Sequence, residues 1–139
     1  MARLFLFVAA VSGLVGVAVG AFGAHALRSR IGPDRIAQLE TGVRYQLWHT
    51  LALFAVVLVD RGAAHAASGW TSYAPLLLAH ESVPAVVAGW LFVAGILLFS
   101  GSLYALALTG ERAWARITPL GGLCFLLGWI ALAWAALLA

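Results

Sequence analysis

The sequence predicts an all-α fold, an integral membrane bundle of four helices that run up-down-up-down as a single transmembrane domain over residues 1–139. Two observations carry this prediction. Hydrophobic residues make up 64% of the chain and charged residues 9%, whereas soluble domains have about 45–50% and about 25%. Three stretches without a charged side chain also reach the roughly 20 residues that a helix needs to cross a bilayer. Lipid is therefore expected to cover much of the apolar surface.

The four spans are expected at about residues 4–24, 43–60, 83–108 and 117–138. The second is the least regular, because only 15 residues separate Arg44 from Asp60 and an α-helix rises only about 1.5 Å per residue. This helix is therefore expected to begin with polar groups at membrane depth. Three explanations remain open: the helix continues past Asp60, the bilayer thins, or the side chain of Arg44 reaches outward to the interface. A pair with Glu40, one turn away, would lower the cost of placing Arg44 at this depth.

The connector between the first two spans carries its own helical signal. Residues 32–34 are Gly-Pro-Asp, which is typical of a turn that leads into a helix. Apolar residues then recur at helical spacing at Ile36, Leu39 and Val43. This pattern predicts a short interfacial helix that leads into the second span.

The other two connectors differ in length. The connector from about residue 60 to residue 82 is the longest, and its Trp70 and Tyr73 are typical of side chains at the membrane interface. The connector near residues 109–115 is short, so the third and fourth spans are expected to pack as an antiparallel hairpin.

The distribution of arginine predicts the orientation in the membrane. An even number of spans places both termini on one side, and the positive-inside rule places the more basic connectors in the cytoplasm. Both termini are therefore expected outside the cytoplasm. The net charge of +3 comes from arginines beside the membrane, which contact lipid headgroups, so it does not indicate nucleic-acid binding. The first and third connectors hold six arginines and the other side two: Arg28, Arg30, Arg35, Arg44, Arg112 and Arg116 against Arg3 and Arg61.

Small residues recur along the spans at spacings that allow two helix backbones to approach closely. Two interpretations remain open. The glycines can pack the four helices against one another, or one glycine face can hold two copies of the chain together as a homo-oligomer. The helix-packing candidates are Gly13, Gly16, Gly20, Gly23, Gly101, Gly121, Gly122 and Gly128.

Polar side chains gather toward the Arg-rich end of the expected bundle, and ionisable groups at membrane depth often mark functional sites. A structural explanation also exists, because tyrosine is common at interfaces and a histidine near a helix end can donate to a carbonyl. The candidate intramembrane cluster is His25, Glu40, Arg44, Tyr45, His49, Tyr104 and Thr118.

The chain contains no motif typical of a catalytic or metal site, so neither enzyme activity nor a cofactor is predicted. Two histidines from neighbouring helices can nevertheless hold a haem iron or supply two of the ligands of a zinc ion. His25 and His49 are the residues through which a haem or a metal would bind.

Four short segments together cover all four spans. Residues 20–27 are GAFGAHAL, residues 41–49 TGVRYQLWH, residues 98–104 LFSGSLY, and residues 117–122 ITPLGG, followed by Gly128-Trp129. In this order they resemble the domain-of-unknown-function family 423, the transmembrane-protein-256-like family. The resemblance implies a small inner-membrane protein with bacterial and mitochondrial members, and it brings no established activity.

Three functions are compatible with the sequence. The first is a non-enzymatic accessory or stabilising subunit of a membrane complex, in contact with membrane lipids and a protein partner. The second is a small oligomeric channel or transporter, with Tyr45, His49 and the Glu40–Arg44 pair along its path. The third is a protein that binds a lipid, a quinone or a haem-like ligand at the Arg-rich interface.

Overall fold

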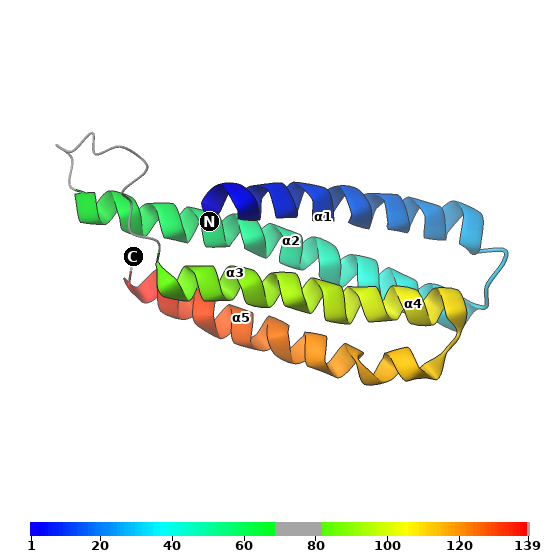
Figure 1. Cartoon of the computed structure of the whole chain (residues 1–139). Helices are drawn as coiled ribbons and strands as arrows, with labels where there is room; N and C mark the ends of the chain where they lie inside the picture. The colour runs from blue at the N-terminus through cyan, green and yellow to red at the C-terminus, as the bar shows by residue number, and fades with distance from the viewer. Residues whose placement is uncertain (69–81, 139) are drawn as a thin grey trace.

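The protein is described by a computed structural model over residues 1–68 and 82–138, and long helices make up nearly all of this part of the chain (Figure 1). The first span is α1 (Ala2–Phe22), which continues into a π-helical turn (Gly23–Leu27). The second span belongs to α2 (Pro33–Ser68), the longest helix.

The third span consists of three consecutive helical segments: α3 (Val83–Gly95), a π-helical turn (Ile96–Ser100) and α4 (Gly101–Thr109). A short 3-10 turn (Arg112–Arg116) then leads into the fourth span, α5 (Thr118–Leu138). Within the described residues, the third and fourth spans therefore form the antiparallel hairpin that the short connector predicted.

Two local signals explain where the third span begins and ends. Ser82 has extended backbone and precedes α3, and a proline occupies the first turn, where its missing N–H group is not needed. Gly110 follows α4 with φ of 77°, a left-handed conformation that glycine adopts without a steric penalty. The chain can therefore turn sharply into the 3-10 segment.

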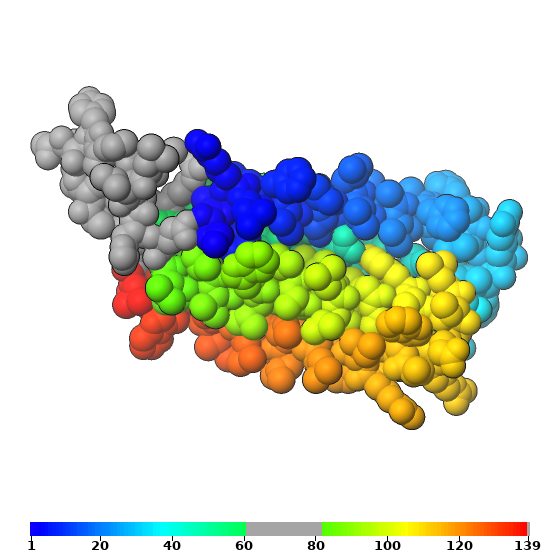
Figure 2. Space-filling view, in the orientation of Figure 1, coloured from blue at the N-terminus to red at the C-terminus, as the bar shows by residue number. Residues whose placement is uncertain are grey.

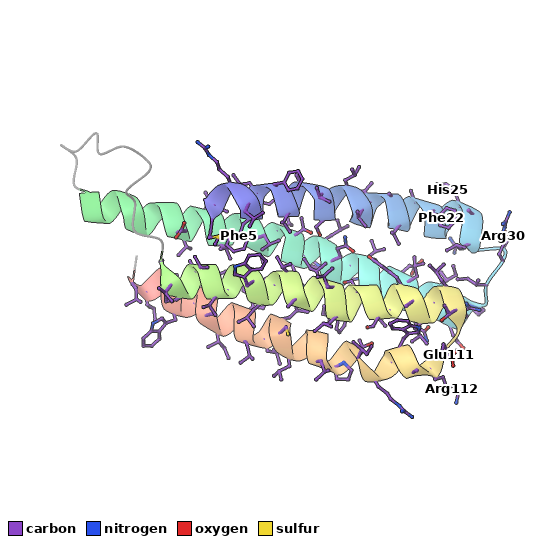
Figure 3. All side chains as sticks on the ribbon, viewed as in Figure 1. Phe5, Phe22, His25, Arg30, Glu111 and Arg112 are labelled. Atoms are coloured by element: carbon purple, nitrogen blue, oxygen red, sulfur yellow. The ribbon has the colours of Figure 1, made fainter. Side chains whose placement is uncertain are left out.

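Four helices are long and apolar enough to cross a membrane, and they alternate in direction with both termini toward the same end of the bundle (Figure 1). For the described residues, this confirms the predicted four-helix membrane bundle. The opposite end carries His25, Arg30, Glu111 and Arg112 (Figure 3), and we call it the Arg-rich end. The candidate spans are Ala2–Leu27, Pro33–Asp60, Val83–Thr109 and Arg112–Leu138.

The first connector and the second differ from the sequence-based expectation. The helix expected around Ile36 is present, but it forms the first turns of α2 rather than a separate element. Ile36 and Leu39 are buried in a cluster with Leu27 and Ala107, so they face the bundle and not the membrane interface. At its other end α2 continues to Ser68, so the connector expected from residue 60 begins later. The interface residues expected there, Trp70 and Tyr73, lie outside the described residues.

The helices pack unevenly around α2. The first helix, α1, lies along α2, while α5 lies along α3 and also touches α2. Phe5 of α1 points toward α3 (Figure 3), and its ring meets Trp90 edge-on at 5.7 Å between ring centroids. The core near the termini is apolar and includes Phe5, Leu53, Val56, Ala88, Phe92 and Leu132.

Glycines allow the close approach of several helices. A Cβ atom at Gly16 would lie 2.9 Å from the side chain of Leu47, and one at Gly23 would lie 2.5 Å from Leu39. At Gly128 it would lie 2.7 Å from Phe92. Each of these distances is too short for a real Cβ, so bulky side chains of one helix fill spaces that glycines leave on the next.

Candidate functional site

Two contacts mark the two ends of the second span. At the Arg-rich end, the guanidinium Nε of Arg35 donates to the carbonyl of Ala107 in the last turn of α4. At the other end, Oδ1 of Asp60 accepts a hydrogen bond from the backbone N–H of Ser82 over 2.9 Å. His49 lies 11 positions from Asp60 and 14 from Arg35, roughly 16 Å and 21 Å along an α-helix. His49 is therefore close to the middle of the second span.

A chain of hydrogen bonds centred on Gln46 joins three helices at a similar depth. The Gln46 amide donates from Nε2 to the carbonyl of Ser12 over 2.8 Å, and its Oε1 accepts from the Tyr104 hydroxyl over 2.8 Å. The hydroxyls of Ser12 and Thr50 are 2.7 Å apart. We call these four residues the Gln46 network.

The Gln46 network fastens α1 and α4 to α2. Only 3% of Gln46 is exposed, and both ends of its amide have partners, as a buried polar group in an apolar environment requires. Hydrogen bonds between membrane helices each contribute about 0.6 kcal/mol on average. Their number and their burial therefore favour a structural role for this network.

His49 occupies the adjacent face of α2 and is 6% exposed. Its Nδ1 lies 2.7 Å from the carbonyl of Tyr45, and its Nε2 lies 3.2 Å from the indole Nε1 of Trp129 in α5. A carbonyl can only accept and an indole N–H can only donate. The hydrogen of the neutral imidazole is thus assigned to Nδ1 from these partners, and Nε2 is an acceptor.

Aromatic rings surround the imidazole of His49. Phe125 stacks on it at 3.5 Å between centroids with 8° between the planes, and Phe92 lies 5.6 Å away. The rings of Tyr45 and Trp129 also lie beside the imidazole, each with its centroid 6.1 Å from that of His49. We call Tyr45, Phe92, Phe125 and Trp129 the aromatic cage. Tyr45 is 42% and Trp129 47% exposed, so these two form the outer, lipid-facing wall.

The structure does not bring His25 and His49 together. His25 is exposed in the π-helical turn after α1, beyond the level at which Gly23 meets Leu39. Leu39 and His49 are ten positions apart on α2, roughly 15 Å. The two imidazoles therefore cannot share one ion or one haem. In the part of the chain that the structure describes, no three His, Cys, Asp or Glu side chains gather as metal ligands.

The other members of the predicted cluster are also dispersed. Glu40 and Arg44 are both exposed, and these two described residues do not form the ion pair that their spacing allows. Thr118 shares a hydrogen bond of 2.8 Å with Ser102, whose hydroxyl also donates to the carbonyl of Phe99. Tyr104 belongs to the Gln46 network, and only Tyr45 and His49 stay together.

Several central residues were absent from the sequence-based cluster. Gln46 and Thr50 lie beside the residues that were chosen, and both are polar side chains inside an apolar span, which is a signal that could have been used. Ser12 lies in the first span among apolar neighbours and carries the same signal. Trp129 gave no such signal, because tryptophan is usual in membrane helices near an interface.

Four membrane-crossing helices, held together by buried polar contacts, define a small multi-pass integral membrane protein. The chain belongs to the family described as Protein of unknown function (DUF423), whose model matches residues 19–122. The resemblance found from the four sequence segments is thereby confirmed.

Curated relatives are similar over nearly the whole chain. The UPF0382 membrane protein YwdK of Bacillus subtilis is 41% identical over 135 residues, which cover 96% of each protein. The UPF0382 inner membrane protein YgdD of Escherichia coli K12 is 39% identical over 127 residues, 91% of this chain and 84% of the relative. No solved structure matches the chain.

Proposed function

We propose that the protein is a non-enzymatic accessory subunit, which binds and stabilises another protein within the inner membrane. The observation that carries this proposal is an open flank between α1 and α4. Near the termini Phe5 ties α1 to α3, but α1 makes few contacts with the third span beyond that point. In Figure 2, part of α2 is visible between α1 and the third span.

Gly101 of α4 is exposed and lies one turn from Tyr104. A Cβ atom there would meet nothing within 4 Å, whereas the glycines at positions 16, 89, 95, 121 and 128 all face tightly packed neighbours. An open glycine on a membrane helix lets another helix approach closely. This arrangement supports a contact with a helix of a partner protein.

The buried polar groups support a binding role rather than catalysis. The members of the Gln46 network hydrogen-bond to one another and to the backbone, and His49 bonds the Tyr45 carbonyl and the Trp129 indole. Among the described residues, these bonds do not pair a nucleophile with a base. A transport role has less support, because apolar side chains fill the bundle between His49 and the termini. We therefore assign no catalytic residue.

Native mass spectrometry of the protein taken from its own membranes in mild detergent tests this proposal. A particle that contains a second polypeptide supports the accessory role. A particle made only of one or several copies of the 14.6 kDa chain contradicts it, and several copies would indicate a homo-oligomer instead.

A matched pair of variants sharpens this experiment. Gly101→Leu adds bulk at the open glycine of α4 and should release the partner without unfolding the bundle. Ala133→Leu adds similar bulk to an exposed position of α5 and should retain the partner. Equal retention by both variants would remove Gly101 from the proposed contact.

We also propose that both termini lie outside the cytoplasm, as the exposed arginines at the Arg-rich end support. Labelling of a single cysteine from one side tests this orientation. In a Cys124→Ser background, Arg30→Cys should react with a membrane-impermeant maleimide only after the cells are opened. Reaction in intact cells would reverse the orientation.

A further inference from the structure

The hydrogen bond between Trp129 and His49 lies at the lipid-facing surface of the bundle. The imidazole of His49 is buried, and the indole of Trp129 covers its Nε2 from the membrane side. The N–N distance of 3.2 Å is at the long end of the usual range for such bonds. A rotation of one half-exposed side chain would therefore make a buried acceptor accessible from the bilayer.

The chemistry of this pair selects the group that can enter. Nε2 of His49 needs a donor, because Nδ1 holds the imidazole hydrogen, and the indole of Trp129 needs an acceptor. A hydroxyl satisfies both, since it can accept from the indole and donate to the imidazole. A carbonyl can satisfy only the indole, and an ether likewise leaves the imidazole without a donor.

The depth of His49 excludes the hydroxyls of lipid headgroups. His49 lies near the middle of the second span, and the polar surface of a bilayer is about 15 Å from its midplane. The hydroxyl must therefore be attached to a molecule that dissolves in the hydrocarbon. Phospholipid glycerol groups do not reach this level.

Aromatic surfaces line the approach to the pair. The ring of Tyr45 packs on Phe99 at 4.6 Å and lies 24° from the plane of Phe125. Gly122 leaves space beside them, since a Cβ there would make only ordinary contacts with Phe99, the nearest at 3.8 Å. The Tyr45 hydroxyl makes no hydrogen bond with any described residue. Flat rings pack favourably in offset or edge-on contact with such walls.

We propose that the surface between α2 and α5 at Trp129 and His49 binds a lipophilic aromatic alcohol of the quinol type, whose hydroxyl inserts between the indole N–H and Nε2. Trp129 acts as the movable cover and His49 as the acceptor. The site binds the reduced, hydroxyl-bearing form of the ligand more tightly than the oxidised, carbonyl form. It does not depend on the accessory role proposed above.

Calorimetric titration of the wild-type protein in lipid nanodiscs tests the proposal with four probes. These are a decyl-substituted benzoquinol, its benzoquinone, its dimethyl ether and hexadecanol. The quinol should bind roughly tenfold more tightly than the quinone or the ether, because only the quinol donates to His49. Equal binding of quinol and ether overturns the proposal. If hexadecanol binds as tightly as the quinol, the requirement for an aromatic ring in the ligand is overturned.

Three variants separate the site from general partitioning into the bilayer. His49→Leu should abolish the preference for quinol over quinone, because both ligands can still accept from Trp129. Trp129→Phe should keep or widen that preference, since the quinol retains its bond to His49 and the quinone loses its only one. Trp134→Phe changes another exposed tryptophan of α5 and should bind as the wild type does. A preference for quinol over quinone that survives in His49→Leu overturns the proposal. Trp129→Phe tests the proposal a second time at an exposed side chain, where the substitution should preserve the fold.

Discussion

Tyr104 of α4 donates its hydroxyl hydrogen to Oε1 of Gln46 in α2 over 2.8 Å, at the level where Gln46 also reaches Ser12 of α1. One amide therefore joins three of the four spans. The three residues are 34 and 58 positions apart in the sequence, so this link exists only once the bundle has assembled.

Gln46→Met should destabilise the protein by about 1–3 kcal/mol, because it removes two buried hydrogen bonds and leaves the Tyr104 hydroxyl without its partner. Reversible unfolding in mixed SDS micelles measures the loss. Gln38→Met is the matched control, because the buried Oε1 of Gln38 has no hydrogen-bond partner. The control should be neutral or slightly stabilising, and a similar loss in both variants would show that the Gln46 bonds contribute little.

At Ser100, in contrast to Gln46, removal of the polar group should stabilise the protein. Its hydroxyl is fully buried in the π-helical turn and has no hydrogen-bond partner among the described residues. Ser100→Ala should therefore stabilise the protein by about 1 kcal/mol, since it removes a desolvated hydroxyl that gains nothing in return. The same SDS unfolding experiment provides the measurement.

Ser102 supplies the comparison for Ser100, because it lies in the same span and its hydroxyl bonds both Thr118 and the carbonyl of Phe99. Ser102→Ala should lower the stability by about 1 kcal/mol. If Ser100→Ala also lowers it, the hydroxyl of Ser100 has a bonding partner such as a buried water, and the prediction is wrong.

The four spans follow from the sequence because the membrane imposes a length of apolar chain that is visible without any partner. The side-chain contacts do not follow in the same way. Helical spacing at Ile36, Leu39 and Val43 is identical in an interfacial helix and in the start of a long one. Only the contact with Ala107 of α4, which is distant in sequence, decides between them.

The candidate site was predictable only where its contacts are local in the sequence. Tyr45 and His49 share a helix face and are one turn apart, so their proximity is local and was expected. Glu40 and Arg44 have the same spacing, but both are exposed and remain apart. The partners of His49 come from α3 and α5, and their positions depend on how those helices rotate about their own axes.

Gly121→Ala should destabilise the bundle by about 1–3 kcal/mol, because the new methyl group would collide with the backbone of Phe99 and push α5 away from the third span. Gly101→Ala should cause no loss, since space is open at that position. Unfolding of the two purified variants in parallel provides the test. Equal stability of the two would mean that the close approach at Gly121 is not retained in the membrane.

Arg35→Ala should weaken the Arg-rich end of the bundle. Its guanidinium donates to the carbonyl of Ala107 at the C-terminus of α4, where helix carbonyls lack intrahelical partners and a positive charge is favourable by about 1 kcal/mol. Hydrogen–deuterium exchange should therefore rise in the last turn of α4 and the first turns of α2. Arg30→Ala removes an exposed arginine in the same connector and should leave that exchange unchanged. If the two variants exchange alike, the contact of Arg35 with α4 does not hold this end together.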